Sequence, residues 1–178
     1  LCVDDEPSIL KSLQRLFAGL PVQVCTASGG QAALELMQSQ KINLIISDMR
    51  MPQMNGAEFL AQAAQLQPDC YRILMTGYAD LASTVQAINI GKIHRYVQKP
   101  WNNQELIGLV DEGLQMFRLV SANKQLTIQV AKQNKELKLL NQQLETMVQH
   151  RTAQLKQTLV QLKSSLAQLD QDHQATLE

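Results

Sequence analysis

Residues 43–56 read NLIISDMRMPQMNG, and this segment is the strongest evidence for the fold of the chain. Its first five residues form a nearly all-apolar run, which is typical of a strand buried on both faces of a parallel sheet. Asp48 ends the run, and Pro52 and Gly56 break the chain before the next apolar segment. The stretch therefore predicts a buried parallel strand that ends at a carboxylate.

On both sides of this strand, short apolar runs alternate with segments that have the apolar period of an amphipathic helix. This alternation predicts an α/β fold, a doubly wound five-stranded parallel sheet with five helices. Pro7 suits the first turn of one helix, Ser28 and Asp80 are expected caps of two others, and Asn102 or Asn103 can start the last. The expected strands are residues 1–3, 22–27, 43–47, 71–75 and 96–97.

The composition of the chain changes near residue 118. Residues 1–118 contain all eight Gly, all five Pro and every aromatic residue, whereas residues 119–178 contain none of these. The second part is rich in Gln and Leu and predicts one unbroken helix. We therefore expect a globular domain over 1–118 and a helical segment over 119–178.

Charge and hydropathy exclude several classes of protein. The 16 Lys and Arg balance the 16 Asp and Glu, so the formal net charge is zero, and no basic patch favours nucleic acid. No apolar run approaches the roughly 20 residues that a membrane span needs. The three Cys are scattered without metal-binding spacing, which indicates reduced thiols. A soluble, cytoplasmic protein that binds neither nucleic acid nor membrane is expected.

Polar residues end four of the predicted strands, and they are the candidate site. They are Asp4, Asp5, Asp48, Thr76 and Lys99. In a doubly wound sheet, ligands bind beyond the carboxyl ends of the strands, so these side chains should converge. Three carboxylates repel one another unless a cation joins them, and Mg²⁺ prefers carboxylate and phosphate oxygens. The set predicts handling of a phosphoryl group, with Lys99 and Thr76 contacting its oxygens.

Four segments, CVDDEPSIL, IISDMRMPQMNG, ILMTGYAD and RYVQKPW, resemble the sequence blocks of the bacterial response-regulator receiver domain, in the same order and at compatible spacing. The resemblance covers about residues 1–118. It implies a flavodoxin-like strand order of 2-1-3-4-5. It also implies phosphorylation by a histidine kinase or a phosphotransfer protein in a two-component phosphorelay.

The resemblance assigns the phosphoacceptor and the metal ligands. Asp48 would accept the phosphoryl group. Asp5 and, more indirectly, Asp4 would hold Mg²⁺ together with Asp48, and the backbone carbonyl of Arg50 would supply a further ligand.

The resemblance also assigns a switch. Thr76 and Tyr96 would move together, the hydroxyl toward the phosphoryl group and the ring inward, while Lys99 would bind the phosphoryl group. The Lys99–Pro100 peptide bond would be cis.

Two alternatives have to be weighed. Haloacid-dehalogenase-type phosphatases also use a strand-end Asp with Mg²⁺, but they place a second Asp two residues later, where this chain has Arg50. Without that proton-transferring group, turnover of an external phosphate ester is not expected, so the chain itself would not be an enzyme beyond its own phosphorylation and dephosphorylation. A dimerisation scaffold whose receiver is never phosphorylated is the second alternative.

The helical segment predicts a partner helix. An apolar seam begins near Leu119, and a solitary helix would leave it in water, so a parallel homodimeric coiled coil is expected. From Leu137 to Leu159, with Arg151 at one core position, the steps run 3, 4, 4, 3, 4, 4, and heptad spacing then resumes. The seam consists of Leu126, Val130, Leu137, Leu140, Leu144, Val148, Leu155, Leu159, Leu162, Leu166 and Leu169.

The segment LNQQLETMVQHRTAQL resembles the linker helices that join sensory or receiver domains to output modules. We expect an output domain beyond residue 178. The resemblance is closest to regulators that carry an HD-GYP cyclic-dinucleotide phosphodiesterase, while diguanylate cyclase and kinase outputs stay open. His150 is expected to be a solvated flank position rather than a phosphoacceptor.

Overall fold

The computed structural model describes residues 1–77 and 92–175. Five parallel strands form one sheet in the order β2-β1-β3-β4-β5, which confirms the predicted doubly wound class and its strand order. The strands are β1 Cys2–Val3, β2 Thr26–Ala27, β3 Leu44–Asp48, β4 Tyr71–Thr76 and β5 Arg95–Gln98.

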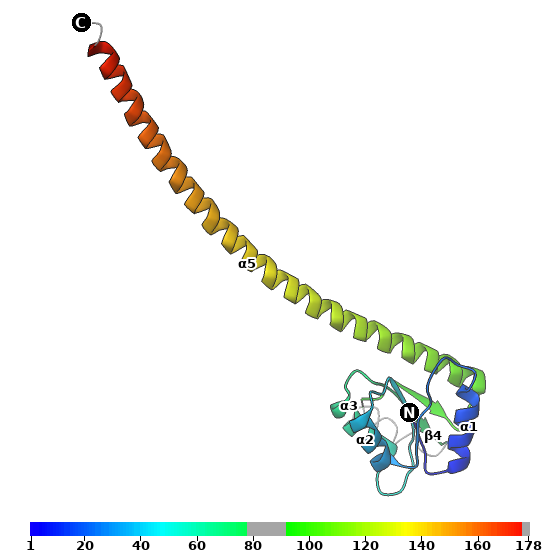
Figure 1. Cartoon of the computed structure of the whole chain (residues 1–178). Helices are drawn as coiled ribbons and strands as arrows, with labels where there is room; N and C mark the ends of the chain where they lie inside the picture. The colour runs from blue at the N-terminus through cyan, green and yellow to red at the C-terminus, as the bar shows by residue number, and fades with distance from the viewer. Residues whose placement is uncertain (78–91, 176–178) are drawn as a thin grey trace. The chain divides into compact units, whose positions relative to one another are not determined.

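Alternating side chains along β3 and β4 divide the core into two layers. Ile45 and Leu74 belong to one buried cluster with α2 (Gly30–Ser39) and α3 (Gly56–Leu66). Ile46 and Ile73, which are paired across the two strands, belong to a second cluster with α1 (Pro7–Phe17) and the start of α5 (Asn103–Ala175). This period of two places helices on both faces of the sheet, with α1 opposite α2 and α3 (Figure 1).

The predicted helix starts are partly confirmed. Pro7 is the first residue of α1, and the Asn102 carboxamide caps α5 by accepting from the N–H groups of Gln104 and Glu105 at 2.9 and 3.2 Å. The expected cap at Ser28 is wrong. Gly29, with an extended backbone, is the N-cap of α2, so Ser28 lies one residue too early to bond the first turn.

The second predicted strand is shorter than expected, and the fourth predicted helix is not described by the structure. The strand expected over 22–27 is restricted to Thr26–Ala27. Within the described residues it pairs with β1, which itself spans Cys2–Val3, so the hydrogen-bonded pairing ends after two residues. The fourth helix, with its expected cap at Asp80, lies outside the described residues.

The side chains of Tyr71 and Arg72 on β4 contact the residues that lead into β5. Arg72 is 4% exposed, and its guanidinium donates to the carbonyls of Pro68, Cys70 and Lys92. Its backbone N–H donates to Nδ1 of His94 at 3.0 Å, and the His94 ring stacks on Tyr71 at a centroid distance of 4.5 Å. Burial, with the charges of Arg72 and Arg95, lowers the pKa of His94, so the neutral ring can accept this bond.

The chain divides into two compact units, Leu1–Lys124 and Gln125–Glu178, and α5 belongs to both. The predicted boundary after residue 118 stays a prediction. In the second unit every residue from 125 to 167 is exposed. Among the helices that the structure describes, none combines the length and the apolar character needed to cross a bilayer.

Two glycines of α5 provide a matched test of how this helix packs on the sheet. A Cβ on Gly113 would lie 2.5 Å from Cδ1 of Tyr71 and 2.7 Å from Cδ1 of Leu44, whereas a Cβ on Gly108 would meet nothing within 4 Å. We expect Gly113→Ala to lower the free energy of unfolding by about 1–3 kcal/mol through overpacking. Gly108→Ala should raise it by up to roughly 1 kcal/mol through helix propensity. Urea denaturation followed by circular dichroism measures both, and a gain in stability from Gly113→Ala would contradict the observed close packing.

Candidate functional site

Three side chains from three different strand ends meet at the carboxyl edge of the sheet. Asp48 is the last residue of β3, Asp4 follows β1, and Lys99 follows β5. Each is two residues beyond a member of the α1–α5 cluster, namely Ile46, Cys2 and Val97. Because side chains alternate along a strand, the three are directed to the same side of the sheet.

The Lys99 ammonium joins the two carboxylates. Its Nζ lies 2.6 Å from Oδ1 of Asp48 and 2.9 Å from Oδ2 of Asp4. The remaining carboxylate oxygens accept backbone N–H groups two residues later, from Arg50 to Asp48 and from Glu6 to Asp4, both at 2.9 Å. Each of the four carboxylate oxygens therefore has a donor.

This cluster is largely removed from solvent. The side chains of Asp4, Asp48 and Lys99 are 1%, 10% and 23% exposed. Burial by itself lowers the pKa of Lys99, but the hydrogen bonds and the charges of Asp48 and Asp4 outweigh burial and leave that pKa raised. Lys99 is therefore charged at neutral pH. It compensates one of the two negative charges of Asp4 and Asp48, and Asp5, the next residue after Asp4, is exposed.

Thr76, Tyr96 and the Lys99–Pro100 peptide bond are the other predicted features of the site. Thr76 is buried at the end of β4, and its hydroxyl donates to the carbonyl of Gly77 at 3.1 Å. The backbone carbonyl of Thr76 accepts the N–H of Lys99 at 2.8 Å. Tyr96 is 51% exposed and alternates with the buried Val97. The Lys99–Pro100 peptide bond is cis, as the resemblance implies.

The predicted metal ligands do not form a cluster in the described part of the chain. Among residues 1–77 and 92–175, no group of three or more His, Cys, Asp and Glu side chains is arranged to hold an ion. Asp4 and Asp48 are bridged by Lys99 instead, and Asp5 faces solvent. The roles of Asp4, Asp5, Asp48 and the Arg50 carbonyl as metal ligands stay predictions.

Gly56 belongs to this site, although the sequence indicated only a chain break there. Its N–H donates to the carbonyl of Met49 at 2.9 Å, and a Cβ at this position would collide with the backbone carbonyl of Asp48. A larger residue would thus displace the strand end that carries Asp48. The sequence does hold a signal: Asn55 and Glu58 form a capping box, which fixes the start of α3 at Gly56.

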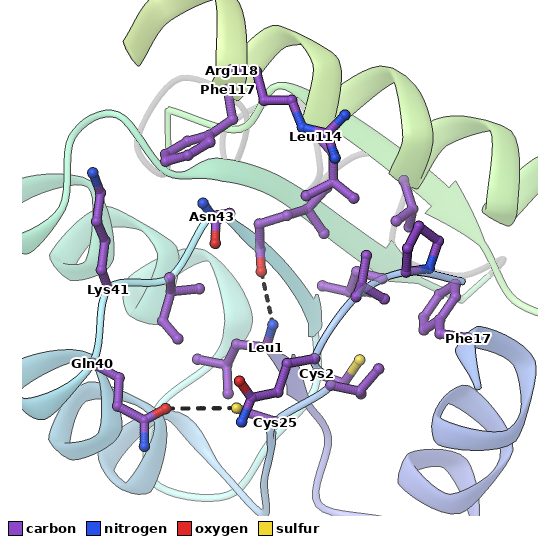
Figure 2. A pocket seen from close by; sticks show the side chains of 18 residues that line it. Leu1, Cys2, Phe17, Cys25, Gln40, Lys41, Asn43, Leu114, Phe117 and Arg118 are labelled. Carbon is purple, nitrogen blue, oxygen red and sulfur yellow. Dashed lines mark hydrogen bonds between the residues drawn. The ribbon is translucent and has the colours of Figure 1, made fainter. Parts of the chain in front are cut away.

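A cavity lies at the opposite edge of the sheet, away from the carboxylate cluster. It has a volume of about 310 Å³, and Leu114, Phe117 and Arg118 of α5 line one side of it (Figure 2). The Leu1 amine lies beside it and donates to the carbonyl of Leu44 at 2.8 Å. Asp4, Asp48 and Lys99 do not line this cavity.

Comparison with known proteins identifies the family. The model of the response regulator receiver domain matches residues 1–111, which is more than half of the chain. The chain belongs to the response regulator receiver family. The structure of the signal receiver domain of an HD domain-containing protein from Pseudomonas fluorescens Pf-5 is 39% identical, with a TM-score of 0.63, and the match covers 66% of this chain and 94% of that one.

Two transcriptional regulators are similar over about two thirds of the chain. The hydrogenase transcriptional regulatory protein HoxA of Bradyrhizobium diazoefficiens is 30% identical over 119 residues, or 67% of this chain. The DNA-binding transcriptional regulator NtrC of Escherichia coli K12 is 34% identical over 116 residues, or 65% of this chain. The match spans 24% of each regulator, about a quarter of its length.

The buried Lys99–Asp48 pair should be strongly coupled. Lys99→Met leaves two buried carboxylates without their cation, so we expect a loss of about 2–3 kcal/mol in the free energy of unfolding. In Lys99→Met/Asp48→Asn the loss should be smaller than the sum of the single losses, by about 1–2 kcal/mol.

A parallel cycle on the exposed pair of Arg95 and Glu112, whose side chains are 52% and 48% exposed, is the control. Its coupling should not exceed about 0.5 kcal/mol because solvent screens it. The coupling energies are measured by urea denaturation. Equal values for the two pairs would contradict the expectation that burial strengthens the Lys99–Asp48 interaction.

Proposed function

We propose that this chain is the phosphoacceptor module of a two-component response regulator and that Asp48 receives the phosphoryl group from a histidine kinase or a phosphotransfer protein. The observation that supports this most is the convergence of Asp48 with Asp4 and Lys99 at the carboxyl edge of the sheet. One Oδ of Asp48 attacks phosphorus while the bond from phosphorus to the donor histidine nitrogen breaks. An aspartyl phosphate forms, and the donor imidazole is released.

The charges at the site fit a divalent cation. Asp4, Asp5 and Asp48 outnumber Lys99 by two negative charges, and hard carboxylate and carbonyl oxygens are the ligands that Mg²⁺ prefers. These three carboxylates and the backbone carbonyl of Arg50 would hold it. When bound, Mg²⁺ neutralises charge on the phosphoryl oxygens.

The chain's own residues supply the remaining contacts. Lys99 already lies 2.6 Å from Asp48, so its ammonium can transfer a hydrogen bond from the carboxylate to a phosphoryl oxygen. The Thr76 hydroxyl, now bonded to the Gly77 carbonyl, would turn to a second phosphoryl oxygen. Tyr96 would follow by moving its exposed ring inward, which changes the surface beside β5.

Phosphorylation can be tested with acetyl phosphate as the donor. We expect the intact mass of the chain to show a single phosphoryl adduct that forms with Mg²⁺ and does not form when EDTA is present from the start. Asp48→Asn should abolish the adduct, while Asp69→Asn, at a carboxylate paired with Lys124, should retain it. A folded protein that takes no adduct in the presence of Mg²⁺ would favour a scaffold that works without phosphorylation.

The second unit is proposed to form a parallel homodimeric coiled coil. Its seam is exposed along the described part of the helix; for example, Leu137, Leu140 and Leu144 are 56%, 52% and 49% exposed. Leaving such a stripe in water is unfavourable by about 25 cal/mol per Å² of apolar area. A second copy of the same helix covers the stripe along its whole length, which supports the dimer.

We further propose a cytoplasmic regulator whose output is a cyclic-dinucleotide phosphodiesterase. The similarity to a receiver from an HD domain-containing protein supports this output, and the chain itself would carry no activity beyond its own phosphorylation and dephosphorylation. HoxA and NtrC are transcriptional regulators by name, so the receiver alone does not determine the output.

Two neighbouring leucines test the dimer. Leu140 lies on the seam, whereas Leu139 is 59% exposed and lies off it. Leu140→Lys should weaken dimerisation by about 2–4 kcal/mol because it places a charge in a core position, and Leu139→Lys should have little effect. Sedimentation equilibrium measures the dissociation constant. A monomeric wild type at micromolar concentration, or equal effects of the two substitutions, would refute the proposed seam.

A further inference from the structure

A buried amide at the end of β5 has no hydrogen-bond partner. Gln98 is the last residue of β5, and its Nε2 is removed from solvent and bonds no atom within residues 1–77 and 92–175. Buried polar groups are nearly always hydrogen-bonded, because an unsatisfied donor loses its water without gaining another bond. This unpartnered donor therefore calls for an explanation.

The ladder between β4 and β5 places the amide beside Thr76. Thr76 is paired with Gln98, and the N–H of Lys99 donates to the Thr76 carbonyl at 2.8 Å, which fixes the register here. The pair two residues earlier is Leu74 with Tyr96, and Leu74 belongs to the buried cluster with α2 and α3. Because side-chain direction repeats every two residues, Thr76 and Gln98 extend from that same face of the sheet.

The Thr76 hydroxyl has a bond that the proposed function would break. Thr76 is 1% exposed, and its hydroxyl donates to the carbonyl of Gly77 at 3.1 Å. When the hydroxyl turns to a phosphoryl oxygen on Asp48, the Gly77 carbonyl loses this donor. The turn therefore frees an acceptor close to Gln98, which carries a donor without an acceptor.

We propose that Gln98 is a positioning residue for the Thr76 hydroxyl, and that its Nε2 donates to the Gly77 carbonyl once the hydroxyl has turned to the phosphoryl group. The inference rests on the proposed phosphorylation of Asp48 and adds a residue that favours the turned hydroxyl. Gln98 acts through Thr76 and makes no contact with the phosphoryl group.

The Gly77 carbonyl is the acceptor that the geometry selects. Adjacent strands lie about 4.8 Å apart, a distance that a carboxamide on two methylene groups can span. The backbone carbonyl of Thr76 already accepts the N–H of Lys99. The next carbonyl along the chain belongs to Gly77, and its side-chain donor is the hydroxyl that leaves.

The unpaired amide then biases the switch. In the unphosphorylated form the buried donor of Gln98 is unsatisfied, whereas in the phosphorylated form it is bonded. Only an interaction that differs between two states shifts their equilibrium, so this difference favours the phosphorylated form. Gln98→Met keeps the length of the side chain and removes the amide, and it should reduce the bias.

Binding of beryllofluoride to the full chain in the presence of Mg²⁺ tests the proposal. This anion takes the place of a phosphoryl group on a carboxylate without forming an acyl phosphate that hydrolyses. Fluorine NMR measures the dissociation constant from the bound signal, and Asp48→Asn shows which signal comes from the site. We expect Gln98→Met to weaken binding about fivefold, the effect of one neutral hydrogen bond.

A double-mutant cycle with Thr76→Val shows whether Gln98 acts through the hydroxyl. In Thr76→Val no hydroxyl occupies the Gly77 carbonyl, so Gln98 can bond it in both states. Adding Gln98→Met to Thr76→Val should therefore change binding by less than about twofold. Equal affinity of the wild type and Gln98→Met, or a fivefold loss in both backgrounds, would overturn the inference. If the wild type gives no bound signal that Asp48→Asn removes, the proposed phosphoacceptor role fails as well.

The unphosphorylated form supplies an independent check. Without beryllofluoride, Gln98→Met should leave the midpoint of urea denaturation unchanged or raised, since the amide has no bond to lose. Gln67→Met is the matched control, because Nε2 of Gln67 donates to the carbonyls of Met37 and Gln40, both at 2.7 Å, and its removal should lower the midpoint. A lowered midpoint of Gln98→Met would show that its amide is already bonded in this form, which also overturns the inference.

Discussion

The site depends on one cation placed between two carboxylates. Asp4 and Asp48 lie at the ends of adjacent strands, and their charges would repel one another in a buried setting without Lys99. Lys99 reaches them from β5, with β4 lying between β5 and β3. The bridge therefore closes only when β1, β3, β4 and β5 have paired in this order. For this reason the surroundings of Asp48 depend on the correct pairing of these strands.

Much of this arrangement could be predicted from the sequence because strand periodicity and strand order determine it. The apolar run before Asp48 and the position of Lys99 after the last strand place both side chains at one edge. The bridging of Asp4 and Asp48 by Lys99 could not be predicted, since it depends on side-chain reach in three dimensions. Two features of the loops were not predicted. The sequence indicated only a chain break at Gly56, and the close approach to Asp48 was missed. Ser28 was expected to cap α2, but the N-cap is Gly29.

Lys99, which is partly buried, and Arg72, which is buried, meet the free-energy cost of removing a cation from water in different ways. Lys99 is paired with carboxylates, and their charges raise its pKa despite burial. Arg72 bonds three backbone carbonyls, and burial lowers its pKa. The first arrangement leaves charge available for an incoming anion, whereas the second uses the planar guanidinium to fix the backbone around the entry to β5.

The faces of α5 have a consequence for how such proteins can diversify. The residues that dock on the receiver, Leu106, Val110, Gly113 and Phe117, are all different from the exposed Met116 and Leu119. Substitutions at the exposed positions need not disturb packing on the receiver, so the pairing surface of the proposed dimer and the stability of the receiver can evolve separately. A paralogue in the same cell could then acquire a distinct pairing preference, and avoid mixed dimers, while its phosphoacceptor domain stayed unchanged.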